Sequence, residues 1–133
     1  MRELQYRELT QKIIGCAMKV HSKLGTGFQE VVYQRALDIE IKRENLNCVR
    51  EKEMKIFYED KEIGTRRVDF FIEGKVMVEL KALTNLESVH LAQALNYLES
   101  YGLKVGLLIN FGAQSLQFKR IHNNKQQAHP SIV

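Results

Sequence analysis

Three side chains that could do chemistry together lie between residues 67 and 81. Asp69 belongs to one apolar segment, and Glu79 and Lys81 end the next, with a Glu-Gly-Lys turn between the two segments. Two carboxylates and an ammonium group at one place are the groups required to hold a divalent metal ion beside a phosphate. The reaction that this combination indicates is cleavage of a phosphodiester bond.

The register of the hairpin predicted for these segments decides whether the charged groups meet. Side chains two residues apart lie on the same face of a strand, so each segment has one apolar face. The two apolar faces coincide only if the loop has an odd number of residues. A three-residue loop pairs Ile72 with Val76 and Asp69 with Glu79. The predicted core-facing set is Val68, Phe70, Ile72, Val76, Val78 and Leu80.

Asp69 and Glu79 would repel each other in this register. Like charges about 4 Å apart cost around 4 kcal/mol at an effective dielectric constant near 20. Lys81 would offset part of this cost, and a bound cation would offset more. Ligation by oxygen atoms suits Mg²⁺ or Mn²⁺. The residues alone leave open a second interpretation, an exposed hairpin with a cross-strand salt bridge.

The composition is typical of a single intracellular domain. The chain has 133 residues, 44% of them hydrophobic, and a net charge of +4, which is compatible with nucleic-acid binding without requiring it. Basic pairs such as Arg66-Arg67 are explained equally well by a solvated surface. The two cysteines are too few for a Cys₄ metal site and are expected to be reduced. Without an apolar run of membrane-spanning length or a signal peptide, we expect a cytoplasmic protein with no membrane partner.

Hydrophobic periodicity predicts the elements that must position these groups. Helices are expected over residues 9–24, 28–43 and 87–100, and strands over 54–58, 68–72, 76–81, 105–111 and 116–121. In the second helix, Val32, Ala36 and Ile39 are expected to face inward. The order α-α-β-β-β-α-β-β predicts an α/β (α+β) domain, a mixed central sheet flanked by helices, over residues 1–121. Residues 122–133 are predicted to be a disordered tail.

Two of the predicted helices carry further polar groups. Glu30 falls in the first turn of the second helix and Tyr33 one turn later, so both can face the same way. A lone carboxylate there is also explained by its favourable interaction with the helix dipole. His90, Gln93 and Tyr97 form a polar stripe on the third helix. Such stripes usually face solvent, but this one follows the Glu-x-Lys strand directly.

Taken together, these residues resemble the PD-(D/E)XK nuclease superfamily. Asp69 followed by Glu79-Leu80-Lys81 is similar to its catalytic signature, and Gly27 to Tyr33 (Gly-Phe-Gln-Glu-Val-Val-Tyr) is similar to that of the GxxExxY proteins. The proline of the superfamily's name is absent. The resemblance covers about residues 9–121 and implies a restriction-endonuclease-like core. The other sequence segments that carry the resemblance are Arg67–Asp69, Val78–Ala82, Gln93–Tyr97 and Gly106–Gly112.

The resemblance implies metal-assisted hydrolysis of phosphodiester bonds, with Mg²⁺ or Mn²⁺ as the cofactor. Asp69, Glu79 and the backbone carbonyl of Leu80 would bind the metal ion, and Glu30 would complete the ligand set directly or through water. The metal would activate a bound water and stabilise the charge that develops on the phosphate.

Three further residues acquire roles from the same resemblance. Lys81 would orient the attacking water or stabilise the transition state. Gln93 and Tyr97 would position the nucleophile or the DNA backbone by hydrogen bonds. The expected function is therefore that of a nuclease, acting on DNA in preference to RNA.

Other functions stay open at this point. A nucleic-acid-binding or protein-interaction module would keep the fold without turnover, although such a module has no use for a repulsive pair of carboxylates. A structural partner protein is a third alternative. A domain this small is expected to work as a homodimer, and nothing in the sequence encodes base-specific readout. The sequence does not distinguish exonuclease from endonuclease, one strand structure from another, or Mg²⁺ from Mn²⁺.

Overall fold

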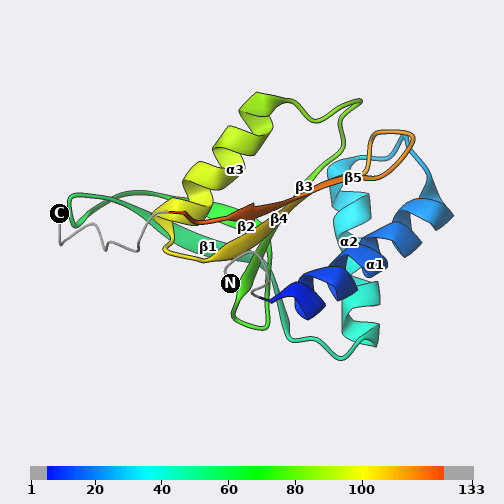
Figure 1. Cartoon of the computed structure of the whole chain (residues 1–133), viewed down its shortest axis with the longest axis horizontal. Helices are drawn as coiled ribbons and strands as arrows, with labels where there is room; N and C mark the ends of the chain where they lie inside the picture. The colour runs from blue at the N-terminus through cyan, green and yellow to red at the C-terminus, as the bar shows by residue number, and fades with distance from the viewer. Residues whose placement is uncertain (1–5, 125–133) are drawn as a thin grey trace.

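The computed structural model describes residues 6–124, and the order of its elements is the predicted one (Figure 1). The helices are α1 (Arg7–Leu24), α2 (Glu30–Arg43) and α3 (Ser88–Ser100). The strands are β1 (Cys48–Tyr58), β2 (Lys61–Ile72), β3 (Val76–Lys81), β4 (Val105–Asn110) and β5 (Gln117–His122). β5 thus includes His122, and residues 125–133 of the predicted tail lie outside the described residues.

The five strands form one mixed sheet in the order β1-β2-β3-β4-β5. β3 and β4 are parallel, and the other neighbours are antiparallel. The parallel pair requires a crossover connection, which α3 supplies. This arrangement confirms the predicted mixed sheet flanked by helices. Within residues 6–124, no helix combines the length and hydrophobicity needed to cross a bilayer.

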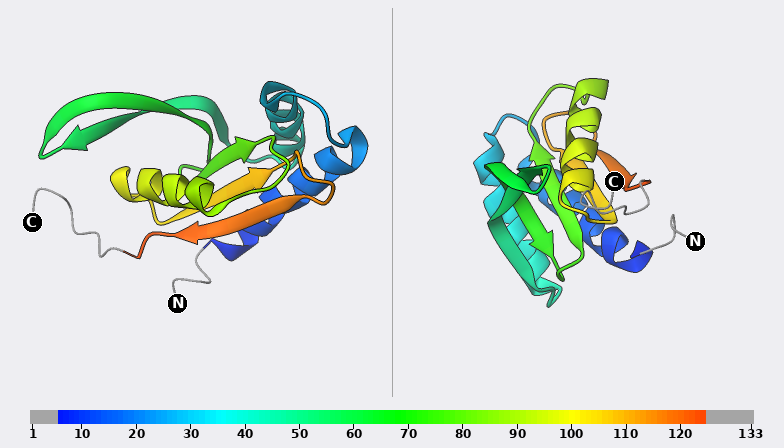
Figure 2. Two further views of the ribbon diagram at one scale, coloured as in Figure 1. Left: turned by 90° about the horizontal axis from the view of Figure 1, so that it is seen from above. Right: turned by 90° about the vertical axis from the view of Figure 1, so that its left-hand side faces the viewer.

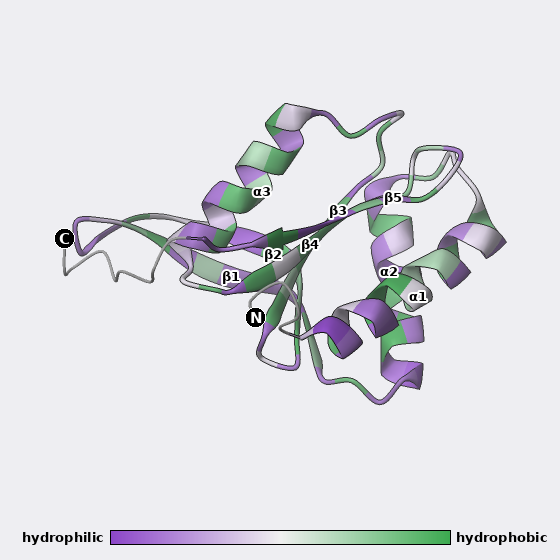
Figure 3. Ribbon diagram, viewed as in Figure 1, coloured by the Kyte–Doolittle hydropathy of each residue, from purple (hydrophilic) through white to green (hydrophobic). Residues whose placement is uncertain are grey.

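Helices cover both faces of the sheet, α1 and α2 on one side and α3 on the other (Figure 2). β4 shows this most clearly, because all six of its residues are buried. Leu107 packs in the cluster with α1 and α2, whereas its neighbour Leu108 packs in the cluster with α3. A strand covered on both faces is expected to be apolar throughout. Figure 3 shows hydrophobic segments in the central strands, with polar and apolar residues alternating along the helices.

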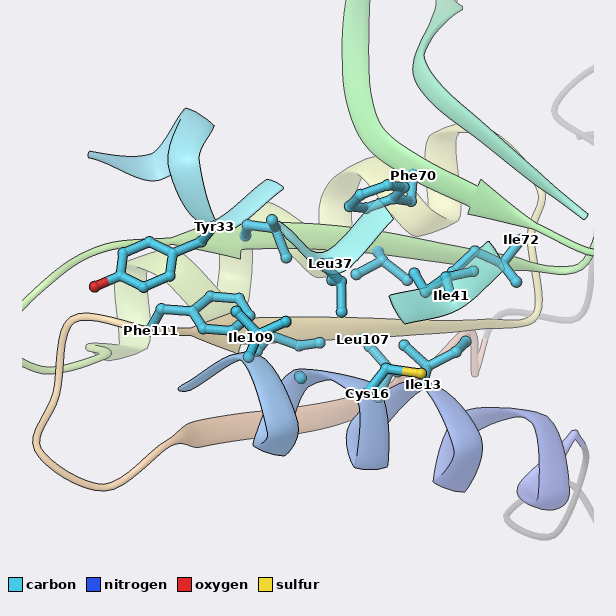
Figure 4. Close-up of a cluster of buried hydrophobic side chains, with 14 of the residues drawn as sticks. Ile13, Cys16, Tyr33, Leu37, Ile41, Phe70, Ile72, Leu107, Ile109 and Phe111 are labelled. Carbon is cyan, nitrogen blue, oxygen red and sulfur yellow. The ribbon is translucent and has the colours of Figure 1, made fainter. Parts of the chain in front are cut away.

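The larger core cluster lies between the sheet and α1 and α2 (Figure 4). The fully buried residues that α2 contributes are Tyr33, Leu37 and Ile41. The prediction that Ile39 faces inward was wrong, since Ile39 is 53% exposed, whereas Val32 is half-buried and Ala36 packs at the edge of the core cluster as expected. Two apolar stripes run along this helix, and the one with the larger side chains is buried because it removes more apolar surface from water.

β2 begins earlier than predicted and forms, with β1, a long hairpin that projects beyond the rest of the sheet (Figures 1 and 2). Val68 was expected to share a face with Phe70, but it packs in the α3 cluster instead. Opposite this point in β1, Glu51 has a φ of 55°, which few non-glycine residues adopt. The side chains of β2 therefore change faces between Val68 and Phe70, next to this irregular residue of β1.

Candidate functional site

The β2–β3 hairpin brings the two predicted carboxylates together. A three-residue loop connects the strands and pairs Ile72 with Val76, which is the predicted register. One residue beyond the last pair, Asp69 Oδ2 accepts a hydrogen bond of 2.8 Å from the backbone N–H of Leu80. Asp69 is therefore attached to the Glu-x-Lys strand at the residue that follows Glu79.

Asp69 is held on its other side by Gln34 of α2. Gln34 Nε2 donates a hydrogen bond of 2.8 Å to Asp69 Oδ1, so both carboxylate oxygens have a fixed partner. Gln34 is buried, with 5% of its side chain exposed. It was not predicted as a functional residue. The signal that could have found it is a single amide on the buried side of a helix, where a polar group requires a partner.

Glu30 is the first residue of α2 and lies one helical turn before Gln34, on the same side of the helix. Partial burial of its carboxyl raises the pKa of Glu30, and the charge of Asp69 raises it further, whereas Lys81 and Arg66 lower it. The carboxyl of Glu30 is therefore close enough to the hairpin charges for them to act on its pKa.

Tyr33 lies in the core and not at the site. Its ring stacks on Phe111 with the centroids 4.8 Å apart, and its hydroxyl donates a hydrogen bond of 2.6 Å to the backbone carbonyl of Gly25 (Figure 4). The prediction that Tyr33 faces the same way as Glu30 was therefore wrong. Tyr33 instead fixes the loop before α2, and this loop sets where Glu30 begins the helix.

Glu79 is buried and forms an ion pair that the sequence did not reveal. Arg66 Nη1 lies 2.5 Å from Glu79 Oε2 and 2.8 Å from the backbone carbonyl of Arg67. The guanidinium of Arg66 also lies over the ring of Tyr97, 4.2 Å from its centroid. Arg66 looked like part of a solvated basic pair, and only Arg67 is exposed in the structure.

The charge of Glu79 is balanced between opposing influences. Burial raises the pKa of Glu79 to about 8, the guanidinium of Arg66 opposes this, and the neighbouring carboxylate of Asp69 adds to it. A buried carboxyl with such a pKa exchanges a proton close to neutral pH. Glu79 is therefore a group that prefers a proton or a cation close by.

The polar stripe of α3 faces this site. Gln93 Nε2 and Tyr97 Oη lie 3.5 Å apart, while His90 accepts a hydrogen bond from the backbone N–H of Glu87 and so caps the helix. The structure thus brings both predicted α3 residues, Gln93 and Tyr97, beside the Glu-x-Lys strand. A pocket lies between α3 and the Glu-x-Lys strand. The residues that line it are Arg66, Glu79, Lys81, His90, Gln93, Ala94, Tyr97 and Leu108.

Asn110 fixes the chain that leaves the site. It is fully buried at the end of β4, in register with Lys81. Its Oδ1 accepts hydrogen bonds from the backbone N–H groups of Leu83 (2.7 Å) and Gly112 (3.1 Å). Its Nδ2 donates to the Leu83 carbonyl and to Gln117, both at 2.9 Å. Asn110 was not predicted as a functional residue, and the signal that could have found it is an amide that ends an otherwise apolar strand.

The donor set suits a hard divalent cation in chemical type. Two carboxylates and a backbone carbonyl at Leu80 are ligands that Mg²⁺ and Mn²⁺ prefer. Within residues 6–124, however, no three acidic, His or Cys side chains are gathered closely enough to hold a metal ion. Glu30 is thus near Asp69 without forming one cluster with Asp69 and Glu79, and Arg66 contacts an oxygen of Glu79.

Comparison with known proteins adds one family and one fold. A solved structure described as "Crystal structure of SSO0001" is 19% identical to this chain, with a TM-score of 0.57. The similarity covers 77% of this chain and 54% of that chain, so this protein spans about half the length of its structural neighbour, and only the fold is shared. No match is found among the curated proteins. The model of the PD-(D/E)XK nuclease superfamily matches residues 7–121, which span the whole sheet and all three helices except the last residue of β5, and the chain belongs to this superfamily.

Proposed function

We propose that this protein is a metal-dependent nuclease that hydrolyses phosphodiester bonds in DNA. The superfamily generally comprises nucleases, and these typically use divalent metal ions. The observation that carries the proposal is the placement of Asp69 against the Glu79–Lys81 segment, beside a pocket lined by Gln93 and Tyr97. A preference for DNA over RNA, a homodimeric assembly and a cytoplasmic location are further parts of the proposal.

The metal ion, Mg²⁺ or Mn²⁺, would be held by Asp69, Glu79 and the carbonyl of Leu80, with Glu30 reaching it directly or through water. When bound, it supplies an acidic water molecule and positive charge beside the phosphate. The hydrogen bond from Gln34 keeps the Asp69 carboxylate in one orientation. A carboxylate that is already oriented does not have to be ordered when its ligand arrives.

The remaining polar groups of the pocket act on the substrate in this proposal. Lys81 presents its amino group to the pocket at the end of β3, where it can orient the attacking water or stabilise charge on the phosphate oxygens. Gln93 and Tyr97 present an amide and a hydroxyl that can hold the DNA backbone. The carboxyl of Glu79, with a pKa near 8, is able to exchange its proton for a cation.

We further propose that the chain is a GxxExxY protein, because each named position of that signature has a physical role here. Gly27 has a φ of 102°, a conformation that glycine adopts without strain. Glu30 faces the charges of the hairpin, and Tyr33 anchors the preceding loop through Gly25. The residues of the signature therefore form a turn and a helix start that position the carboxylate of Glu30 at the beginning of α2.

One observation favours a second candidate, a nucleic-acid-binding module on the same fold without catalysis. The ion pair with Arg66 neutralises Glu79 without any metal ion. A site that is already neutralised could bind nucleic acid and never cleave it. The two candidates differ in metal binding and in turnover, and both can be measured.

The test is cleavage of end-labelled single-stranded, double-stranded and branched DNA and of single-stranded RNA, in Mg²⁺, Mn²⁺ or EDTA. Glu79→Gln is the site variant, and Glu53→Gln, an exposed glutamate on β1 of the same sheet, is the matched control. We expect metal-dependent products from the wild type and from Glu53→Gln, and none from Glu79→Gln. Tight DNA binding without products in any metal ion would reject the nuclease and favour the binding module.

A further inference from the structure

Arg66 is a cation built into the pocket rather than a surface charge. Its guanidinium has three separate contacts, with the Glu79 carboxylate, the Arg67 carbonyl and the Tyr97 ring. Its side chain is 26% exposed, and that of Glu79 is 6% exposed, so the pair is largely shielded from water. Arg67, the next residue, is exposed and contributes only its backbone carbonyl to this arrangement.

We propose that Arg66 occupies the Glu79 carboxylate as an internal counter-ion, and that a divalent metal ion must displace it in order to bind. This inference rests on the proposed function, because Glu79 is one of the proposed metal ligands. The carboxylate oxygen that contacts Arg66 belongs to the same group that the metal ion requires. Two positive centres on one buried carboxylate would repel each other strongly, since little water separates them.

The pocket offers the displaced guanidinium another partner. The hydroxyl of Tyr101 is buried and is the one buried side-chain polar atom among the described residues that has no hydrogen-bond partner. Its ring stacks on Tyr97, with the centroids 6.2 Å apart, and its hydroxyl is close enough to Arg66 and Glu79 for both charges to shift its pKa.

Buried hydroxyls normally have a partner, and the Tyr101 hydroxyl would gain one in a second arrangement of the pocket. In that arrangement Arg66 stays on the face of Tyr97 and donates to Tyr101 instead of Glu79. The same movement would open the pocket on the side of the Glu-x-Lys strand. Arg66 and the metal ion therefore compete for the Glu79 carboxylate, so the affinity for the metal ion depends on Arg66 as well as on the metal ligands.

The test compares Mg²⁺ binding, measured by titration calorimetry at pH 9, for the wild type, Arg66→Met and Arg67→Met. Met keeps the length and the apolar stem of Arg without its charge, and Arg67→Met controls for the loss of one positive charge from the same segment. We expect Arg66→Met to bind Mg²⁺ at least about tenfold more tightly than the other two, which is the effect of about one broken ion-pair contact. Arg66→Lys should restore the weaker binding, because it keeps a cation beside Glu79.

A second readout on the wild type covers the case in which Arg66→Met does not fold. The Nε–H signals of ¹⁵N-labelled arginine report the contact of each guanidinium in solution. We expect the Arg66 signal to move on addition of Mg²⁺ and the Arg67 signal to stay. An Arg66 signal that stays in place when the site is saturated would overturn the displacement.

The outcomes separate this inference from the proposed function. If the wild type binds Mg²⁺ and Arg66→Met binds it equally or more weakly, the displacement is wrong and the metal site stands. If neither protein binds Mg²⁺ or Mn²⁺, the displacement and the metal-dependent function are both rejected.

Discussion

The two faces of β3 divide the work of this protein between stability and chemistry. On one face, Val76, Val78 and Leu80 pack against α1 and α2 in a cluster made of apolar residues. The other face also begins with a buried side chain, Met77, but continues with Glu79 and ends near α3 in a pocket of charged and polar groups. One strand, with alternating residues, thus contributes to a core and to a site. Burial alone therefore does not distinguish the two faces of β3, because both contain buried side chains. The residues that each side chain contacts distinguish them.

The largest effect is expected on the polar face, from Lys81→Met. Loss of the ammonium group should lower the rate of DNA cleavage by about 10³-fold, because it removes positive charge from the transition state. Stability should change by about 1 kcal/mol at most. Rates with labelled DNA and urea unfolding would measure the two effects, with the exposed Lys104→Ala as the control. A variant that is active at the wild-type rate would remove Lys81 from the site.

The reverse outcome is expected on the apolar face, from Leu37→Ala in α2. Leu37 is fully buried, and its truncation should lower the free energy of unfolding by about 2–5 kcal/mol. Ile39→Ala, on the same helix but 53% exposed, should change stability by no more than about 0.5 kcal/mol. Urea unfolding of the two variants checks this directly. Equal losses would mean that the stripe around Ile39 is buried in solution.

The pH dependence of stability sharpens the comparison, because Glu79 is the buried carboxyl of the polar face. Its pKa is raised from 4.5 to about 8 by burial, so the folded protein binds this proton more tightly than the unfolded chain. The contribution of Glu79 is then fully present below pH 4.5 and is lost as the pH rises through about 8.

In the absence of metal, the wild type should therefore lose a few kcal/mol relative to Glu79→Gln between these limits. Thermal or urea unfolding from pH 4 to 9 would measure the difference. A difference that does not vary with pH would show that Glu79 keeps its charge throughout. Metal affinity should rise over the same range, since the cation replaces the proton.

The smallest of these effects is expected for Gln34→Ala. Asp69 would lose one of its two hydrogen bonds, which should lower cleavage by about 10–100-fold, the usual cost of removing a group that orients a metal ligand. Gln114→Ala, at an exposed position, is the control. The affinity for the metal ion should fall together with the cleavage rate. If the cleavage rate falls while the metal affinity is unchanged, Gln34 does not act by orienting the Asp69 ligand.

The parts of the site that were predictable from the sequence are those that depend on local geometry. The alternation of apolar residues and a three-residue loop were sufficient to align Asp69 with the Glu-x-Lys strand. The polar stripe of α3 followed from helical spacing. Each of these inferences spans few residues, and the backbone geometry of a strand or helix determines the answer.

Contacts between distant segments were not predictable in this way. Gln34 and Asp69 are 35 residues apart, and the amide of Gln34 gave no sign of its partner. Arg66 contacts Glu79 in a part of β2 whose side chains face α3, since Val68 packs in the α3 cluster and Phe70 does not, and regular alternation did not predict this change of face. In α2, two apolar stripes were available, and the stripe chosen as inward-facing left Tyr33 free to face the same way as Glu30, whereas Tyr33 is buried in the core.

The buried amide of Asn110 also has a consequence for the order in which the protein matures. It joins β4 to Leu83, a residue 27 positions earlier, and so it can form only after the crossover helix has been made and the parallel pair has closed. Long-range closures of this kind are slow steps in folding. A chain that ends after the β2–β3 hairpin already contains both carboxylates, but the segment after Lys81 is not yet held by Asn110. We therefore expect the segment that follows the Glu-x-Lys strand to become fixed only after β4 has joined the sheet, so the candidate site is complete only in the finished fold.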